Sequence, residues 1–246
     1  MSTAGGPPET LDRFGRLFRH FPVAVSAGAM AGAWARQEDA PAGATVVVDR
    51  EISALGRIGT PWVAAPESTL ALAIVLRPSI PPEDADVAWL VGALGVIDGV
   101  EAVTGRACSA WWPDRVVDST TSATVAALKV DSQLGPGEVR AAVVTARLDL
   151  AELGVEPGRR DELLEAVVRA TDVSAGELAD DAEAAAARYE RRCALVGRRV
   201  KLQLLPKGET RGTAAHVDRR GRLRLESATG MVERISVDML RDLQIV

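Results

Sequence analysis

The sequence TVVVDREISALGRIGTPWVAAPESTLALAIVLRP, residues 45–78, reads as a strand, a glycine-containing loop and a second strand. Residues 46–48 form a β-branched run, and residues 69–76 form a continuous apolar run of the length of a buried strand. Between these runs, Gly56 and Gly59 allow the backbone to approach a ligand closely. Arg57 carries a planar, permanently charged group that pairs with phosphate or carboxylate. The stretch therefore predicts two core strands joined by a loop suited to binding.

The bulk composition indicates a globular protein with a well-buried core. The chain has 246 residues, of which 47% are apolar, enough for one large domain or a medium domain with a small one. It has no uninterrupted apolar run of the length that spans a bilayer, and its first ten residues lack the basic and apolar regions of a leader peptide. We therefore expect a cytoplasmic protein without a membrane partner.

Cysteine, histidine and net charge narrow the function classes further. Cys108 and Cys193 are too few for a disulfide framework, and neither they nor the isolated His20 and His216 have zinc-site spacing, so we expect no metal site. The net charge of −5 argues against a dedicated nucleic-acid binder. Because there are only three lysines, positive charge is almost entirely arginine. Together with the abundance of alanine, this is an actinobacterial-type composition.

Periodicity predicts alternating helices and strands up to about residue 192. The first prediction is a short helix at 11–21, where apolar residues recur at helical spacing. Ser174, with Glu177 three residues later, is a candidate N-cap for the last helix of this part. The elements that follow the first helix are a strand at 22–27, a helix at 28–37, the two core strands, a helix at 84–103, strands at 108–112, 120–130 and 138–150, and helices at 158–170 and 174–195.

The pattern changes at Gly197, where short strands with regular turn signals begin. Four strands are expected, at 198–205, 210–218, 223–227 and 231–236, and strands this short make a small barrel or sandwich. We place a domain boundary near Cys193. The chain is thus predicted to consist of an N-terminal segment with its short helix (1–21), a main domain (22–192) and a small C-terminal β-barrel (193–246).

The order of these pieces resembles the biotin protein ligases, within the biotin and lipoate protein ligase superfamily. The resemblance covers about residues 22–240 and is strongest near the C-terminus, in the segments at 196–200, 212–214, 218–223 and 235–238. It implies an α+β fold: the mixed sheet with helices of the class II aminoacyl-tRNA synthetases and biotin ligases, followed by a small C-terminal β-barrel.

Two sequence blocks carry the resemblance in the main domain. The family's G-R-G-R-x-G-R-x-W loop, which closes over biotin and the adenylate, corresponds to residues 54–62, and its K-W-P-N-D motif corresponds to residues 111–115. The ligand-binding positions that survive in this chain are Gly56, Arg57, Gly59, Trp62, Trp112 and Pro113.

The other functional positions of the family are lost. The loop lacks its first glycine and two of its three arginines, and Trp111 stands where the motif has lysine. The S-T-N motif falls on Ala29-Met30-Ala31, the strand lysine falls near Ser122, and the late G-I-G-x-N segment becomes residues 144–148. Lys129 is no substitute, because its odd spacing from Ser122 places it on the opposite strand face.

These losses point to a binding or interaction module without catalytic residues. Acyl-adenylate formation brings a carboxylate to the α-phosphate of ATP, and cations must neutralise both anions. The alternative is an active biotin-[acetyl-CoA-carboxylase] ligase, or another acyl-protein ligase, with rearranged site residues. That alternative implies biotin, ATP and Mg²⁺ as ligands and a biotin/lipoyl carrier domain as partner. The resemblance also permits a homodimer, while the acidic balance disfavours a DNA-binding regulator.

The sequence allows two interpretations for several residues. Arg57 is either a clamp for phosphate or carboxylate or a loop residue paired with Asp49 or Glu51. Trp111 and Trp112 either stack on a flat ligand or pack as core and rim residues. Two aspartates, at positions 114 and 118, are either Mg²⁺ ligands or turn formers.

Overall fold

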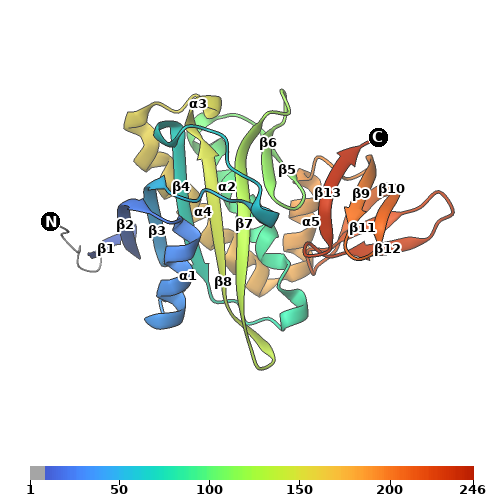
Figure 1. Cartoon of the computed structure of the whole chain (residues 1–246), viewed down its shortest axis with the longest axis horizontal. Helices are drawn as coiled ribbons and strands as arrows, with labels where there is room; N and C mark the ends of the chain where they lie inside the picture. Colours follow the sequence, from blue (N-terminus) through green and yellow to red (C-terminus); the bar gives the residue numbers. More distant parts are fainter. Residues whose placement is uncertain (1–8) are drawn as a thin grey trace.

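A mixed eight-stranded sheet forms the centre of the computed structural model, which describes residues 9–246 (Figure 1). All neighbouring strands are antiparallel except β2 and β3, which are parallel. This is the mixed sheet that the sequence predicts. In spatial order the strands are β1 (Thr10–Arg13), β2 (Arg16–Ala24), β3 (Thr45–Glu51), β4 (Thr69–Leu76), β8 (Glu138–Asp149), β7 (Thr124–Gly135), β6 (Arg115–Asp118) and β5 (Cys108–Trp111).

The N-terminal helix predicted at residues 11–21 is wrong, because this segment forms the β1–β2 hairpin. Phe14 and Gly15 both have positive φ, at 56° and 72°, which suits the tight turn of a two-residue hairpin. Phe18 then points into the core at 2% exposure, and its ring meets that of Phe14 edge to face at 5.5 Å. Pairing with β3 thus overrides the helical spacing of the apolar side chains.

Helices cover both faces of the sheet. Helix α1 (Ala27–Gln37) packs on β3, β4 and β8, whereas α2 (Val87–Thr104) packs on the opposite face. Alternate strand residues accordingly divide between two cores; Val46 and Val48 face α1, and Val47 faces the other core. A short helix, α3 (Leu150–Leu153), follows β8.

Helix α2 is the central helix of the larger core. A window of the segment Pro82–Thr104 has a mean hydropathy of 1.6, apolar enough for a membrane span by composition, yet 72% of that window is buried inside the fold. Glycines allow close helix packing: a Cβ at Gly95 would lie 2.8 Å from Thr171 Cα, and one at Gly99 would lie 2.6 Å from Val167 Cα. These contacts bring α4 (Arg160–Asp180) directly against α2.

The predicted break between the last two helices of the main domain is also wrong. Helix α4 continues through Ser174, which is 1% exposed and faces the interior. The actual N-cap is Asp181, whose side chain accepts from Ala184 N at 3.0 Å and begins α5 (Ala182–Arg192).

The C-terminal unit is a five-stranded antiparallel sheet (Figure 1). Its first four strands match the predicted ones, and the fifth was missed because its sequence, LRDLQI, has little apolar alternation. The boundary proposed near Cys193 falls between α5 and β9. The spatial order is β12 (Val232–Ile235), β11 (Leu223–Glu226), β10 (Gly208–Val217), β9 (Arg199–Leu204) and β13 (Leu240–Ile245).

Candidate functional site

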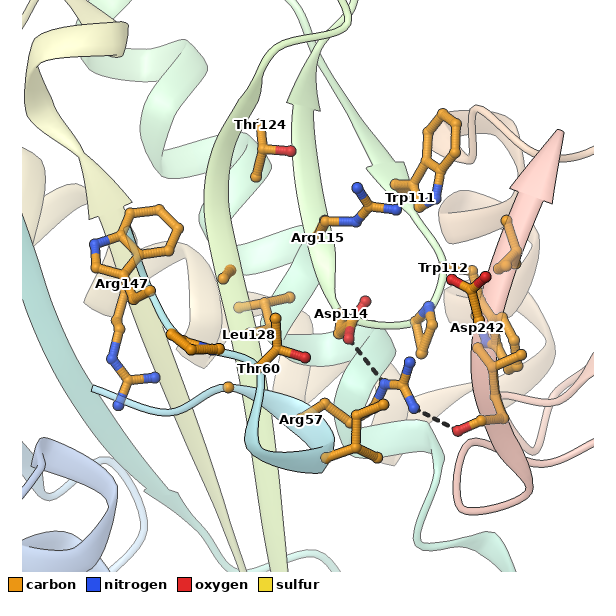
Figure 2. A pocket seen from close by; sticks show the side chains of 18 of the residues that line it. Arg57, Thr60, Trp111, Trp112, Asp114, Arg115, Thr124, Leu128, Arg147 and Asp242 are labelled. Atoms are coloured by element: carbon orange, nitrogen blue, oxygen red, sulfur yellow. Dashed lines mark hydrogen bonds and ion pairs between the residues drawn. The ribbon is translucent and has the colours of Figure 1, made fainter. Parts of the chain in front are cut away.

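A cleft of about 370 Å³ lies between three segments that are distant in the sequence (Figure 2). The glycine-containing loop forms one wall, the β5–β6 turn forms the second, and the start of β13 forms the third. Of the six predicted positions, Gly59 lies in the loop without lining the cleft. The five that line it are Gly56, Arg57, Trp62, Trp112 and Pro113.

The loop has a defined shape that its glycines permit. Leu55 and Pro61 form an isolated bridge, and Gly56 N donates to Thr60 O at 2.7 Å. Gly59 has a φ of 78°, in the left-handed region where glycine is favoured, and the preceding Ile58 also has a positive φ, of 50°. The loop is therefore a closed turn between β3 and β4.

Arg57 ties this loop to both other walls. Its Nε donates to Asp114 Oδ2 at 2.8 Å, and its Nη1 donates to Leu240 O at 2.6 Å (Figure 2). The side chain is only 12% exposed. Arg57 is therefore already paired with a carboxylate of the chain, and the predicted alternative of a pair with Asp49 or Glu51 is wrong.

The two adjacent tryptophans have different roles. Trp112 is fully buried, and its Nε1 donates to Gly221 O at 3.0 Å, so it packs between the main domain and the C-terminal unit. Trp111 is half-buried at the rim of the cleft, with the Arg115 guanidinium 5.0 Å from its ring centroid. The Trp111 Nε1 is buried and has no hydrogen-bond partner among residues 9–246. Trp111 thus keeps an unused donor beside the cleft.

Neither of the two candidate Mg²⁺ ligands is free. Asp114 pairs with Arg57. Asp118 accepts from the amides of Thr121 and Thr120, which together with Arg106 lower the pKa of its carboxyl to about 2. Both therefore serve as turn and loop anchors. Within the part of the chain that the structure describes, three or more potential metal-ligating side chains are nowhere grouped.

Arg147, which the sequence analysis did not single out, forms a buried ion pair beside the cleft. It projects from β8, and the Arg147 and Glu51 side chains are 2% and 3% exposed. Arg147 donates twice to Glu51 and also to Leu55 O at 3.2 Å. Glu51 in turn accepts from Ala27 N at 2.7 Å, so the pair fastens the start of α1 to the loop. A charged residue inside an otherwise apolar strand was the available signal.

Arg115 is the second residue that sequence reasoning missed. It is the first residue of β6 and the direct cross-strand partner of Trp111. In contrast to Arg57 and Arg147, Arg115 has no carboxylate partner among residues 9–246. The strand predicted at 108–112 has no partner strand predicted at Arg115, so this pairing could not be foreseen.

Other predicted positions lie outside the cleft. Ala29-Met30-Ala31, on which the family's S-T-N motif falls, forms part of the first turns of α1 and is not in the lining. Ser26, which precedes them, caps that helix by accepting from Ala29 N at 3.1 Å. Lys129 pairs with Asp131 at 3.0 Å, away from the cleft.

The cleft thus combines aromatic walls with two arginines, Arg115 and Arg241, that have no carboxylate partner among residues 9–246; Arg241 donates only to the backbone oxygens of Asp238 and Leu240. Trp62 lines it while donating to Thr69 Oγ1 at 2.9 Å, and Trp111 and Arg115 form the opposite rim. Hydroxyls of Thr60 and Thr124 also line it. Such a lining can hold a flat group against the indoles and an anion against Arg115.

Comparison with known proteins gives the same fold. No family model matches the chain. The chain is 24% identical over 144 residues to the bifunctional ligase/repressor BirA of Bacillus subtilis, an alignment that covers 58% of this chain but less than half, 43%, of that relative. Among solved structures, it is similar to the biotin protein ligase of Aquifex aeolicus in complex with biotin and ATP, with TM-score 0.72, 18% identity, and 93% of this chain and 99% of the other covered.

A second solved structure is a biotin protein ligase-like protein of unknown function from a Silicibacter species. The TM-score is 0.70 at 16% identity, and the match covers 94% of this chain and 98% of that one. The predicted α+β fold with its small C-terminal β domain is confirmed. The chain has the fold of the biotin protein ligases and is a biotin protein ligase-like protein.

Proposed function

We propose that this protein binds a small, flat, anionic ligand in the cleft and does not ligate biotin. The observation that carries the proposal is the state of the cleft arginines: Arg57 and Arg147 are each neutralised by a carboxylate of the same chain. The position that has lysine in the family's motif carries Trp111. The guanidinium groups of Arg115 and Arg241, which have no carboxylate partner among residues 9–246, then remain for an anion, and Arg115 lies directly across the strand pair from Trp111.

The charge balance explains why ligation is disfavoured. Adenylation requires cations around both the attacking carboxylate and the α-phosphate. Removing one partner of a buried charge pair costs about 2–5 kcal/mol. Because about 1.4 kcal/mol corresponds to a tenfold change, the loss of several cationic positions lowers the rate of adenylation by many orders of magnitude.

The first test is biotin transfer. With biotin, ATP and Mg²⁺ at saturating concentrations, we expect biotinyl-AMP formation at least about 1,000-fold slower than by an active ligase assayed in parallel. We also expect no label on a biotin carrier domain. Mass spectrometry of the reaction and streptavidin blotting of the carrier measure the two outcomes. Accumulation of biotinyl-AMP at a rate comparable to that of the active ligase would refute the proposal.

The second test concerns the anion contact. AMP, with a flat base and one phosphate, is the probe, and quenching of tryptophan fluorescence reports its binding, since Trp62, Trp111 and Trp112 line the cleft. Arg115→Gln should weaken AMP binding at least about tenfold, because hydrogen bonds to charged groups contribute about 1.5–3 kcal/mol. Arg140→Gln, which removes the same charge from an exposed position outside the cleft, should leave binding unchanged. Equal effects of the two variants would exclude this mode of binding.

A second candidate function is an active acyl-protein ligase with rearranged residues. It is favoured by the position of Arg115, which reaches the cleft from directly across the β5–β6 pair from Trp111. A cation at that place could replace the missing lysine. In this case biotin, ATP and Mg²⁺ are the ligands and a biotin/lipoyl carrier domain is the partner. Alanine at Arg57, or glutamine at Arg115, would then abolish turnover.

Location and assembly complete the proposal. We place the protein in the cytoplasm, because α2, the one helix of residues 9–246 that is apolar enough to cross a membrane, is a core helix. A homodimer is compatible with the sheet, whose outer strands are β1 and β5. Sedimentation velocity over a hundredfold concentration range distinguishes monomer from dimer.

A further inference from the structure

A second cavity, of about 480 Å³, lies on the C-terminal unit and shares no lining residue with the cleft. It opens beside β10, β11 and β12, which lie at the opposite end of the fold from β1 in Figure 1, and α5 packs against β10. Its lining is strongly cationic, because only two carboxylates, those of Glu183 and Asp218, accompany His216 and five arginines. The arginines are Arg219, Arg220, Arg222, Arg224 and Arg234.

His216 and two of the arginines form a row across the sheet. His216 on β10 is the cross-strand partner of Arg224 on β11, and Arg224 is in turn the partner of Arg234 on β12. Like charges placed directly opposite each other on neighbouring strands destabilise a sheet. The row therefore costs stability unless an anion covers it.

The chain itself does not supply that anion. His216 pairs with Glu190 on α5, but Arg224 and Arg234 have no ion-pair partner among residues 9–246. The Asp218 carboxylate is used by the β10–β11 turn, where its Oδ1 accepts from the backbone amides of Arg220 and Arg222 at 3.0 and 3.1 Å.

The remaining contacts leave most of the positive charge in place. Arg219 lies 3.5 Å from Glu183, and Arg220 lies 3.0 Å from Asp84. Arg222 has no carboxylate partner in the described chain and donates to the backbone oxygen of Glu83 at 2.7 Å. Arg222, Arg224 and Arg234 thus have no carboxylate within ion-pair distance among residues 9–246.

Buried donors point to a missing acceptor. The Nε atoms of Arg222 and Arg224 are buried and have no hydrogen-bond partner within residues 9–246. Buried polar groups in folded proteins are normally hydrogen-bonded, and an unmade bond to a charged group is especially unfavourable. A ligand with several acceptor oxygens in the cavity would pair with the guanidinium groups of the row, which include that of Arg224.

We propose that this cavity binds a compact polyphosphate, either inorganic pyrophosphate or the diphosphate end of a nucleotide. Guanidinium groups pair with phosphate oxygens through two parallel hydrogen bonds. Neighbouring strands lie about 4.8 Å apart, so the row spans about 10 Å, which suits two linked phosphates better than one carboxylate. The chain's net charge of −5 opposes a long nucleic acid, whose binding requires an extended basic surface.

Isothermal titration with pyrophosphate on the full chain tests the proposal. Arg224→Gln/Arg234→Gln should weaken binding by at least about 100-fold, because it removes two charge-assisted contacts. The matched control is Arg199→Gln/Arg211→Gln, which removes two charges from the same sheet outside the cavity and should change binding less than about threefold. Arg234→Gln alone, at an exposed position, should show an intermediate loss of binding.

Removing the like-charge pair should also leave the melting temperature of the double variant equal to or above that of the native chain.

Comparison of ligands separates the sources of phosphate. If ADP binds more tightly than pyrophosphate, the site takes a nucleotide; if the two are equal, it takes the diphosphate alone, and either result supports the proposal. No heat with millimolar pyrophosphate or ADP, or equal weakening in the two double variants, would overturn it. Tighter binding of a 20-nucleotide single strand or of hexaglutamate would overturn it as well. AMP binding in the cleft, followed by tryptophan fluorescence, is independent of these outcomes.

Discussion

Replacing Arg147 with methionine is expected to lower the free energy of unfolding by about 3–5 kcal/mol, because Glu51 would be left charged and buried. Both side chains are at most 3% exposed, so water cannot replace the lost partner. Urea denaturation followed by circular dichroism measures the change, and the m-value reports whether the unfolding transition is otherwise the same.

Two further variants make this prediction specific. Glu51→Gln/Arg147→Met removes both charges and keeps an oxygen to accept from Ala27 N, so most of the lost stability should return. Arg169→Met breaks an ion pair with Glu165 in which the two side chains are 64% and 37% exposed, and it should cost less than about 1 kcal/mol. A change below about 1 kcal/mol for Arg147→Met would mean that the pair does not hold a buried charge.

The second large effect is expected at Trp112. Truncation to alanine should cost about 3–5 kcal/mol, because a fully buried indole is lost together with its hydrogen bond to Gly221 O. The turn that carries the acceptor oxygen is tightly packed, so it cannot move to fill the space left by the indole. The φ of Gly221 is 80°, and a Cβ there would lie 2.6 Å from Asp86 O. Thermal unfolding measures the loss of stability.

Trp111 is the matched control, since it is the neighbouring residue and only half-buried. Trp111→Ala should cost clearly less, about 1–2 kcal/mol, because part of its surface already faces solvent. Limited proteolysis near Gly197 should accelerate in Trp112→Ala and not in Trp111→Ala, because the Trp112 contact joins the main domain to the C-terminal unit. Equal effects of the two substitutions would assign both residues to the rim.

Much of the fold could be predicted from local pattern. Residues 69–76, predicted as a core strand, are buried along their whole length, as a strand with helices on both faces requires. The N-terminal hairpin could not be predicted from local pattern. Its residues Leu11, Phe14 and Phe18 satisfy the helical period, whereas β2 forms because it pairs with β3. The same holds for Ser174, whose cap pattern lost to burial against neighbouring helices.

The resemblance assigns the glycine loop and Trp112 to one candidate site, and both lie along the same cleft. The charge balance of that cleft could not be predicted from the sequence. The ion-pair partners of the arginines could not be predicted from the sequence, because Arg57 pairs with Asp114 and Arg147 pairs with Glu51 across long stretches of chain. Arg115 became a cleft residue only through the strand pair that sets it opposite Trp111.

The packing of α2 against α4 also sets the order in which the protein can form during translation. Helix α2 ends at Thr104, whereas the helix that covers its far side is complete only at Asp180. At about 5–20 residues per second, several seconds pass on the ribosome with this apolar helix uncovered. The nascent chain therefore depends on chaperones or on rapid completion, and a ribosome pause between these two helices would expose it to aggregation.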